Sequence, residues 1–196
     1  MQASEILKTY RKELIAEIEA VQEGDFEGCI RLLLDAYRQD KQIFLAGNGG
    51  SAATANHFLC DFGKNAVRGN RRRFRVISVC DNIERITSLG NDIAYEAVFS
   101  EQLVNLMNAG DLLIVISASG SSPNILRACE YARERGARVM ALAGFSGGKL
   151  KDLADAALFS AMTSYERLED LHLMLLHLFV CYFKANQVLL DGAGAV

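Results

Sequence analysis

Short apolar runs alternate with segments of helical periodicity through most of this 196-residue chain, and that alternation limits the fold more than any other feature. The apolar runs predict five strands, at residues 43–46, 74–79, 112–116, 138–142 and 156–159. Between and after them, the periodicity predicts helices from about residue 51, around 95–107, over 123–135 and over 166–187, with a short turn at 147–150. Buried strands separated by helices predict an α/β fold, in which a parallel sheet is covered on both faces.

Two amphipathic helices are predicted before the first strand. Apolar residues recur at helical spacing from Ile6 to Val21, and again from Phe26 to Tyr37. With 51% hydrophobic residues, the chain can bury one core, and nothing in the sequence separates two. We therefore expect a single domain over residues 1–196, with N-terminal helices over 1–40, an α/β core over 41–187 and a tail over 188–196.

Composition and charge exclude several classes of partner. The net charge of -3 gives no basic bias of the kind that binding to nucleic acid or an anionic membrane favours. The first twenty residues are rich in charges, which argues against a signal peptide, and no apolar run approaches bilayer length. The five cysteines are scattered without a Cys-x-x-Cys pair, so we expect reduced, mostly buried thiols and a cytoplasmic location.

A local basic cluster precedes the second strand. It consists of Arg68, Arg71, Arg72, Arg73 and Arg75. Such a run usually forms a solvated loop, and the alternative is a contact to phosphate or to another subunit.

Two strand-to-helix loops have an unusual composition. Gly47-Asn48-Gly49-Gly50-Ser51 follows the first strand, and the third strand continues into Ser117-Ala118-Ser119-Gly120-Ser121-Ser122-Pro123. Ser122 is predicted as the N-cap of the next helix and Pro123 as its first residue. A helix N-terminus presents free N–H groups and partial positive charge, which favours a bound phosphate. Neither loop has the spacing of a P-loop or of a dinucleotide-binding motif.

The three histidines and nearby carboxylates offer two interpretations. His57 and Asp61 lie four residues apart on one helix, and Glu169 and His177 lie roughly on one side of the last helix. In the first interpretation His57 and Asp61 are an ordinary helix pair, while Glu169, Asp170 and His172 form an exposed stripe. In the second, the set His57, Asp61, Glu169 and His177 converges near the serine loop as acid, base or metal ligands.

These motifs together resemble the sugar isomerase (SIS) family, and within it the phosphoheptose isomerases. The resemblance rests on Gly47–Ser51 with His57, Phe58 and Asp61, on the strand ending in Ser-x-Ser-Gly-x-Ser, on Gly90-Asn91-Asp92, and on Asp170 to His177. It covers almost the whole chain. It implies a three-layer α/β/α sandwich with a five-stranded flavodoxin-like sheet, N-terminal helices used in oligomer packing and a long C-terminal helix. It also implies a homotetramer, and an enzyme that interconverts sedoheptulose 7-phosphate and D-glycero-D-manno-heptose 7-phosphate for bacterial surface heptose.

The resemblance also assigns individual residues. By it, Asp61 is the catalytic base and His177 the catalytic acid, and a divalent metal, zinc, has His57, Asp61, Glu169 and His177 as ligands. The residues that it places around the sugar phosphate are Asn48, Gly49, Gly50, Ser51, Asp61, Asn91, Asp92, Ser117, Ala118, Ser119, Ser122 and Glu169.

Several positions depart from the family pattern. Asp61 replaces a glutamate, Glu169 a glutamine, Ala118 a threonine and Asn65 an arginine. The side chain of Asp61 is one methylene shorter than that of glutamate, which retracts its carboxylate. In a catalytic site, a displacement of about 1 Å can lower the rate ~100-fold. The added charge of Glu169 strengthens a divalent-cation site, so we expect metal here. Two alternatives stay open: isomerisation of another sugar phosphate, and a non-catalytic SIS protein that binds a partner such as a replication initiator.

Overall fold

The computed structural model describes residues 2–191, and its centre is a sheet of five parallel strands in the order β2-β1-β3-β4-β5. The strands are β1 (Gln42–Gly47), β2 (Arg75–Ser78), β3 (Leu112–Ser117), β4 (Arg138–Ala143) and β5 (Ala156–Phe159). All five coincide with predicted strands to within two residues. The α/β prediction is therefore confirmed, with the strand order of flavodoxin-like sheets.

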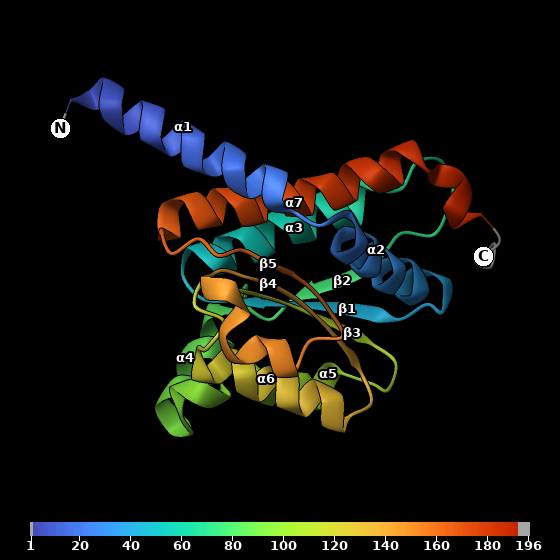
Figure 1. The fold of residues 1–196 in the computed structure, drawn as a ribbon. Helices are drawn as coiled ribbons and strands as arrows, with labels where there is room; N and C mark the ends of the chain where they lie inside the picture. Colours follow the sequence, from blue (N-terminus) through green and yellow to red (C-terminus); the bar gives the residue numbers. More distant parts are fainter. Residues whose placement is uncertain (1, 192–196) are drawn as a thin grey trace.

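Helices cover both faces of the sheet, which gives the three predicted layers (Figure 1). One face carries α2 (Glu23–Arg38), α3 (Gly50–Asn65) and α7 (Tyr165–Ala185), and the other carries α4 (Ile83–Asp92), α5 (Ser100–Leu106) and α6 (Pro123–Glu134). Alternate residues of each central strand enter opposite cores: Ile43 and Leu45 pack under α3 and α7, whereas Phe44 packs under α5 and α6. Continuous apolar strands arise because both faces of the sheet are buried.

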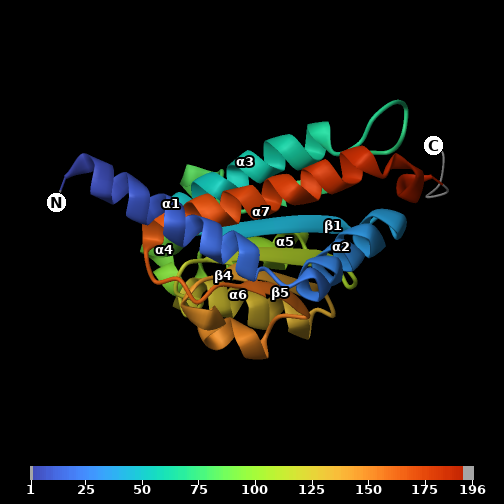
Figure 2. The ribbon, with the colours of Figure 1, turned by 45° about the horizontal axis from the view of Figure 1, so that its top comes forward.

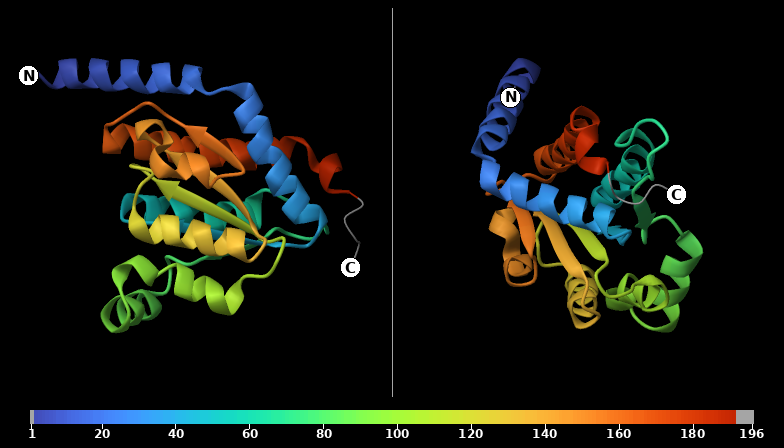
Figure 3. Two further views of the ribbon diagram at one scale, coloured as in Figure 1. Left: turned by 60° about the horizontal axis from the view of Figure 1, so that its bottom comes forward. Right: turned by 90° about the vertical axis from the view of Figure 1, so that its right-hand side faces the viewer.

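The first helix, α1 (Ala3–Ala20), extends away from this body (Figures 1 and 3). None of its residues is buried. Two polar contacts join it to the start of α7: Tyr10 donates to Asp170 at 2.5 Å, and Arg167 pairs with Glu13 at 2.6 Å. Leu14 of α1 is partly buried against the core. By contrast α2 contributes Cys29, Ile30, Leu33, Ala36 and Tyr37 to the core, so the two N-terminal helices have different roles in the packing.

The structure corrects the region between β2 and β3. The single helix predicted around residues 95–107 is a 3-10 turn, Tyr95–Ala97, followed by the shorter α5. A helix that was not predicted, α4, precedes them. Its apolar residues Ile83, Ile86 and Leu89 recur at helical spacing, so the sequence does carry a signal for it, although Ile83 is 69% exposed.

The last segments differ in detail. The turn expected at 147–150 is a longer 3-10 stretch, Phe145–Asp152, and α7 is followed by another, Gln187–Leu190. Leu190, in the predicted tail, is buried against the core. Residues 192–196 of that tail lie outside the described part. Within residues 2–191, no helix is long and apolar enough to span a bilayer.

Candidate active site

The two unusual loops meet at the point where the strand order reverses. The chain leaves β1 toward β2 on one side, while the neighbouring β3 leads to β4 on the other side, and ligands in such sheets bind beyond the carboxyl ends of the strands there. A cavity of about 130 Å³ lies at this place. It is lined by Asn48, Ser51, Ile116, Ser117, Ala118, Ser119, Ser122, Tyr165 and Glu169.

Glycines give both loops their shape. Gly49, the N-cap of α3, has φ +54°, and Gly120 in the serine loop has φ +61°, a conformation that L residues rarely adopt. A Cβ at Gly120 would also overlap the carbonyl group of Gly147. Helix α6 begins at Pro123, and the side chain of its N-cap, Ser122, makes no capping hydrogen bond. The Ser122 hydroxyl is therefore available to a ligand beside the helix N-terminus.

The structure brings most of the predicted binding residues together. Seven of them line the cavity: Asn48, Ser51, Ser117, Ala118, Ser119, Ser122 and Glu169. Gly49 and Gly50 form the backbone at the start of α3. Asn91 and Asp92 instead lie at the exposed end of α4, hydrogen-bonded to each other at 2.8 Å, and do not line this cavity.

Two tyrosines at the cavity were not predicted. Tyr165, the first residue of α7, lines it, and the Tyr95 hydroxyl donates to Oδ1 of Asn48 at 3.1 Å. Both are more than half exposed. No periodic pattern marks such residues, and only the position of Tyr95 shortly after Gly90-Asn91-Asp92 could have drawn attention to it.

The second part of the site lies farther along α3 and α7, which run side by side (Figure 2). His57 Nε2 and His177 Nε2 are 3.0 Å apart, and Asp61 Oδ2 lies 3.5 Å from the first and 3.4 Å from the second. Ligand atoms at about 2.0–2.1 Å from a tetrahedral zinc lie roughly 3.3 Å from one another. These three residues can therefore hold a metal ion in that geometry.

The oxygens of Asp61 have separate partners. Oδ1 accepts a hydrogen bond from Asn65 Nδ2 at 2.9 Å, which leaves Oδ2 directed at the two imidazoles. Asn65, where the family pattern has an arginine, thus orients the shorter carboxylate. Outer hydrogen bonds of this kind fix the geometry of metal ligands and of catalytic bases.

Glu169 lies away from this cluster and next to the phosphate loops. It lines the cavity, and its carboxylate packs so closely on Gly50 that a Cβ there would overlap it. His57, Asp61 and His177 form the cluster without it. From Ser51 to His57 the distance along α3 is about 9 Å at 1.5 Å per residue. The site therefore has two ends: a cavity between the two loops that could hold a phosphate, and the titratable cluster of His57, Asp61 and His177. Glu169 lies at the cavity end.

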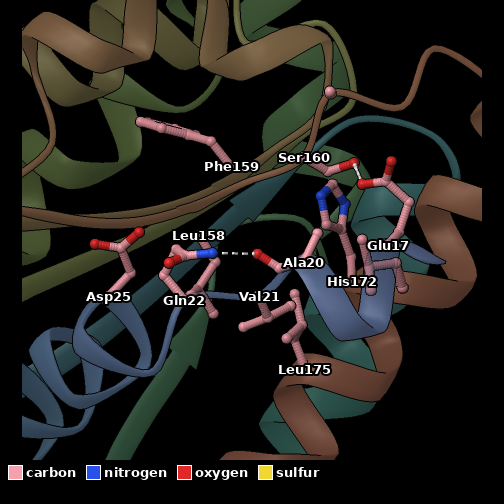
Figure 4. A pocket seen from close by; sticks show the side chains of 12 residues that line it. Glu17, Ala20, Val21, Gln22, Asp25, Leu158, Phe159, Ser160, His172 and Leu175 are labelled. Carbon is pink, nitrogen blue, oxygen red and sulfur yellow. Dashed lines mark hydrogen bonds between the residues drawn. The ribbon is translucent and has the colours of Figure 1, made fainter. Parts of the chain in front are cut away.

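His172 corrects the interpretation of an exposed stripe on α7. It is 1% exposed, and neither ring nitrogen has a hydrogen-bond partner among residues 2–191. It lines a separate cavity of about 220 Å³ between α1, β5 and α7, where Ser160 donates to Glu17 at 2.5 Å (Figure 4). The charged side chains lining this cavity are the carboxylates Glu17 and Asp25, which would repel a phosphate.

The basic cluster forms ion pairs away from the cavity. Arg71 pairs with Asp191 at 2.6 Å, and both Arg72 and Arg75 pair with Asp40. None of the five arginines lines the cavity at the carboxyl ends of the strands. Of the five free cysteines, Cys29 and Cys129 are buried, Cys80 is half-buried, and Cys60 and Cys181 are exposed, so fewer are buried than predicted.

Comparisons with known proteins agree with this geometry. A family model described as "SIS domain" matches residues 8–144. The phosphoheptose isomerase of a Nitratiruptor species is 38% identical over 147 residues, covering 75% of this chain and 78% of that protein. The phosphoheptose isomerase of a Geobacter species is 32% identical over 180 residues, covering 92% and 93%.

Solved structures give the same relationship. Phosphoheptose isomerase GmhA from Neisseria gonorrhoeae superimposes with a TM-score of 0.84 at 28% identity, covering 94% of this chain and 100% of that one. A phosphoheptose isomerase from Francisella tularensis gives a TM-score of 0.86 at 26% identity, with the same coverage.

Proposed function

We propose that this chain, which belongs to the SIS domain family, interconverts sedoheptulose 7-phosphate and D-glycero-D-manno-heptose 7-phosphate in the synthesis of surface heptose. The observation that carries the proposal is the two-ended site. A cavity built from two strand-to-helix loops lies on the same pair of helices as the cluster of His57, Asp61 and His177. Phosphoheptose isomerases are relatives of this chain over most of its length.

The phosphate is bound at the serine loop. The hydroxyls of Ser117, Ser119 and Ser122 and the N-termini of α3 and α6 surround the cavity, and each favours an anion. Asn48, Gly49, Gly50 and Ser51 supply the other side, with Ala118 beside the serines. Asn91 and Asp92 lie on α4, from which they contact the sugar rather than the phosphate. Binding energy at this remote end aligns the reacting carbons at the other end.

The reaction is a proton transfer between two adjacent carbons. Asp61 removes the proton from the carbon next to the carbonyl group, while His177 donates a proton to the carbonyl oxygen, which gives a cis-enediol. Return of the proton to the other carbon and loss of the hydroxyl proton complete the isomerisation without any external oxidant or reductant. Asn65 holds Asp61 in the orientation that this step needs.

Zinc fits the titratable end. Two imidazole nitrogens and a carboxylate oxygen are a common donor set for this metal, and their separations match it. His57, Asp61 and His177 would hold the ion. Glu169, which lies at the phosphate end of the site, would have to turn away from Gly50 to serve as the proposed fourth ligand. When bound, zinc supplies a Lewis acid that polarises a carbonyl group.

Removal of metal tests this assignment. Treatment of the purified protein with a chelator should lower turnover of sedoheptulose 7-phosphate by at least about tenfold, and stoichiometric zinc should restore it. Elemental analysis before and after dialysis measures occupancy. If protein without metal keeps full activity, zinc is not part of the site, whereas an absence of turnover under all conditions contradicts the isomerase proposal. A parallel assay on a six-carbon ketose phosphate tests the preference for a seven-carbon sugar.

Two substitutions should separate the ends of the site. Ser119→Ala removes a phosphate contact and should raise KM about tenfold with kcat nearly unchanged. His177→Ala removes the acid and should lower kcat by about 100-fold or more with binding retained. Steady-state kinetics on both variants, with phosphate inhibition as the binding measure, checks this division. Near-wild-type turnover by His177→Ala would show that the acid is another residue.

Assembly and location complete the proposal. We place the enzyme in the cytoplasm, because all five of its cysteines are free. We further infer a homotetramer in which residues 1–40 take part in packing, because residues 2–191 of the same chain leave the apolar side chains of α1 exposed.

A further inference from the structure

Asn124, the second residue of α6, is 2% exposed and lies behind the cavity rather than in its lining. Its Oδ1 accepts a hydrogen bond from the backbone N–H of Ile125 at 3.0 Å, which that N–H shares with the carbonyl oxygen of Ser122 at 3.1 Å. A backbone N–H can only donate, so the atom facing it must be the amide oxygen and not the nitrogen. The orientation of the Asn124 amide is therefore fixed by its own helix.

This orientation fixes that of Asn48 in turn. Asn124 Nδ2 donates to Asn48 Oδ1 at 2.8 Å, and Asn48 Nδ2 donates back to Asn124 Oδ1 at 2.9 Å. The Tyr95 hydroxyl donates to the same Asn48 Oδ1 at 3.1 Å. Two donors fill the two acceptor sites of that oxygen. The second hydrogen on Nδ2 is then what Asn48 has left for a ligand in the cavity.

We propose that Asn124 is a positioning residue that makes Asn48 present a hydrogen-bond donor, and not an acceptor, to the bound phosphate. The inference rests on the proposed function, since it concerns the phosphate end of that site. A phosphate oxygen accepts hydrogen bonds. If the Asn48 amide were turned the other way, its Oδ1 would face the phosphate oxygen, and two acceptors would repel each other. The reciprocal pair also joins the loop after β1 to the start of α6, across the point where the strand order reverses.

The test compares binding and turnover in Asn124→Ala, Asn48→Ala and the double variant. Inorganic phosphate binding is measured by calorimetry, and KM and kcat are measured on sedoheptulose 7-phosphate. Asn124→Ala should weaken phosphate binding and raise KM by about tenfold each, with kcat within about twofold of wild type. The double variant should be no worse than Asn48→Ala alone, because both changes remove one coupled unit. Asn124→Asp, which keeps the acceptor but loses the donor, should be at least as impaired as Asn124→Ala.

Asn56→Ala is the matched control. Asn56 is a half-buried asparagine on α3 whose Oδ1 accepts from Ser78 at 2.5 Å, away from the cavity. This variant should lose thermal stability and keep its phosphate affinity and KM. Unchanged phosphate affinity in Asn124→Ala, additive effects in the double variant, or a wild-type protein that binds no phosphate would each overturn the inference. A wild-type protein that binds phosphate without turning over the sugar would contradict only the proposed function.

Discussion

Asp61 and His172 show how differently two titratable side chains can be held at the scale of single residues. Each Asp61 oxygen has a partner, one on Asn65 and the other on the two histidines. Neither ring nitrogen of His172 has a hydrogen-bond partner in the part of the chain that the structure describes. Burial lowers the pKa of His172 to about 4, so its ring is neutral at pH 7. A side chain that must stay neutral makes stability depend on pH.

We predict that the protein loses stability between about pH 6.5 and pH 4 because of His172. In the unfolded chain this histidine has a pKa near ~6.5 and becomes protonated below that pH, whereas in the folded protein it stays neutral down to about pH 4. The free energy of unfolding therefore falls by up to about 3 kcal/mol as the pH decreases through this range. His172→Phe should flatten this dependence. Thermal melts at several pH values measure it, with the exposed His57→Gln as control in the presence of chelator. An equally steep pH dependence in His172→Phe would contradict the assignment.

At the scale of elements, the start of α3 and the start of α7 meet at Gly50 and Glu169. The carboxylate packs on the glycine so closely that no side chain fits between them. The far end of a glutamate is flexible, so a larger residue at position 50 would displace Glu169 rather than the helix. The contact therefore matters for the site more than for the fold.

Gly50→Ala should accordingly lower kcat/KM by about tenfold or more while changing the melting temperature by only a few degrees. Gly63→Ala, in the interior of the same helix with open space around its Cα, is the control and should stabilise the protein by up to about 1 kcal/mol without loss of activity. Kinetics and thermal melts on both variants provide the comparison. Full activity in Gly50→Ala would mean that the position of Glu169 is not needed.

At the scale of the whole molecule, α1 is the helix whose apolar side chains remain exposed in a single chain. Ile6, Leu7, Ile15 and Ile18 are 38–60% exposed along it. The polar contacts Tyr10 to Asp170 and Glu13 to Arg167 fix the helix on α7 without covering those side chains. A helix with an uncovered apolar face usually has a partner.

We predict a tetramer for the wild-type protein in light scattering coupled to size exclusion. Ile6→Glu together with Ile15→Glu should reduce the mass to that of a smaller species, because burying a charge in the interface is unfavourable. Lys8→Gln, on the same helix, should leave the mass unchanged. A monomeric wild-type protein at assay concentration would contradict the role assigned to α1.

The local pattern of the sequence was sufficient for the strands, the two loops and the start of α6 at Pro123, because each depends on neighbouring residues: apolar runs, glycines and a helix cap. The prediction missed α4, although Ile83, Ile86 and Leu89 recur there at helical spacing, and it missed the break in the segment near Tyr95. Residue chemistry offered His57, Asp61, Glu169 and His177 as one converging set, to which the resemblance gave roles, and the structure brings three of the four together.

Tertiary structure alone decided which of these residues meet. His57 meets His177 only because α3 and α7 pack in a particular register. That register cannot be derived from the spacing of residues within either helix. The same holds for Glu169 beside Gly50, for the missing partners of His172 and for the amide pair of Asn48 and Asn124. Sequence by itself determined the elements and the loops, since these follow local rules. Tertiary packing determined the site, since contacts such as those of Asn48 with Asn124 and of His57 with His177 join residues 76 and 120 positions apart.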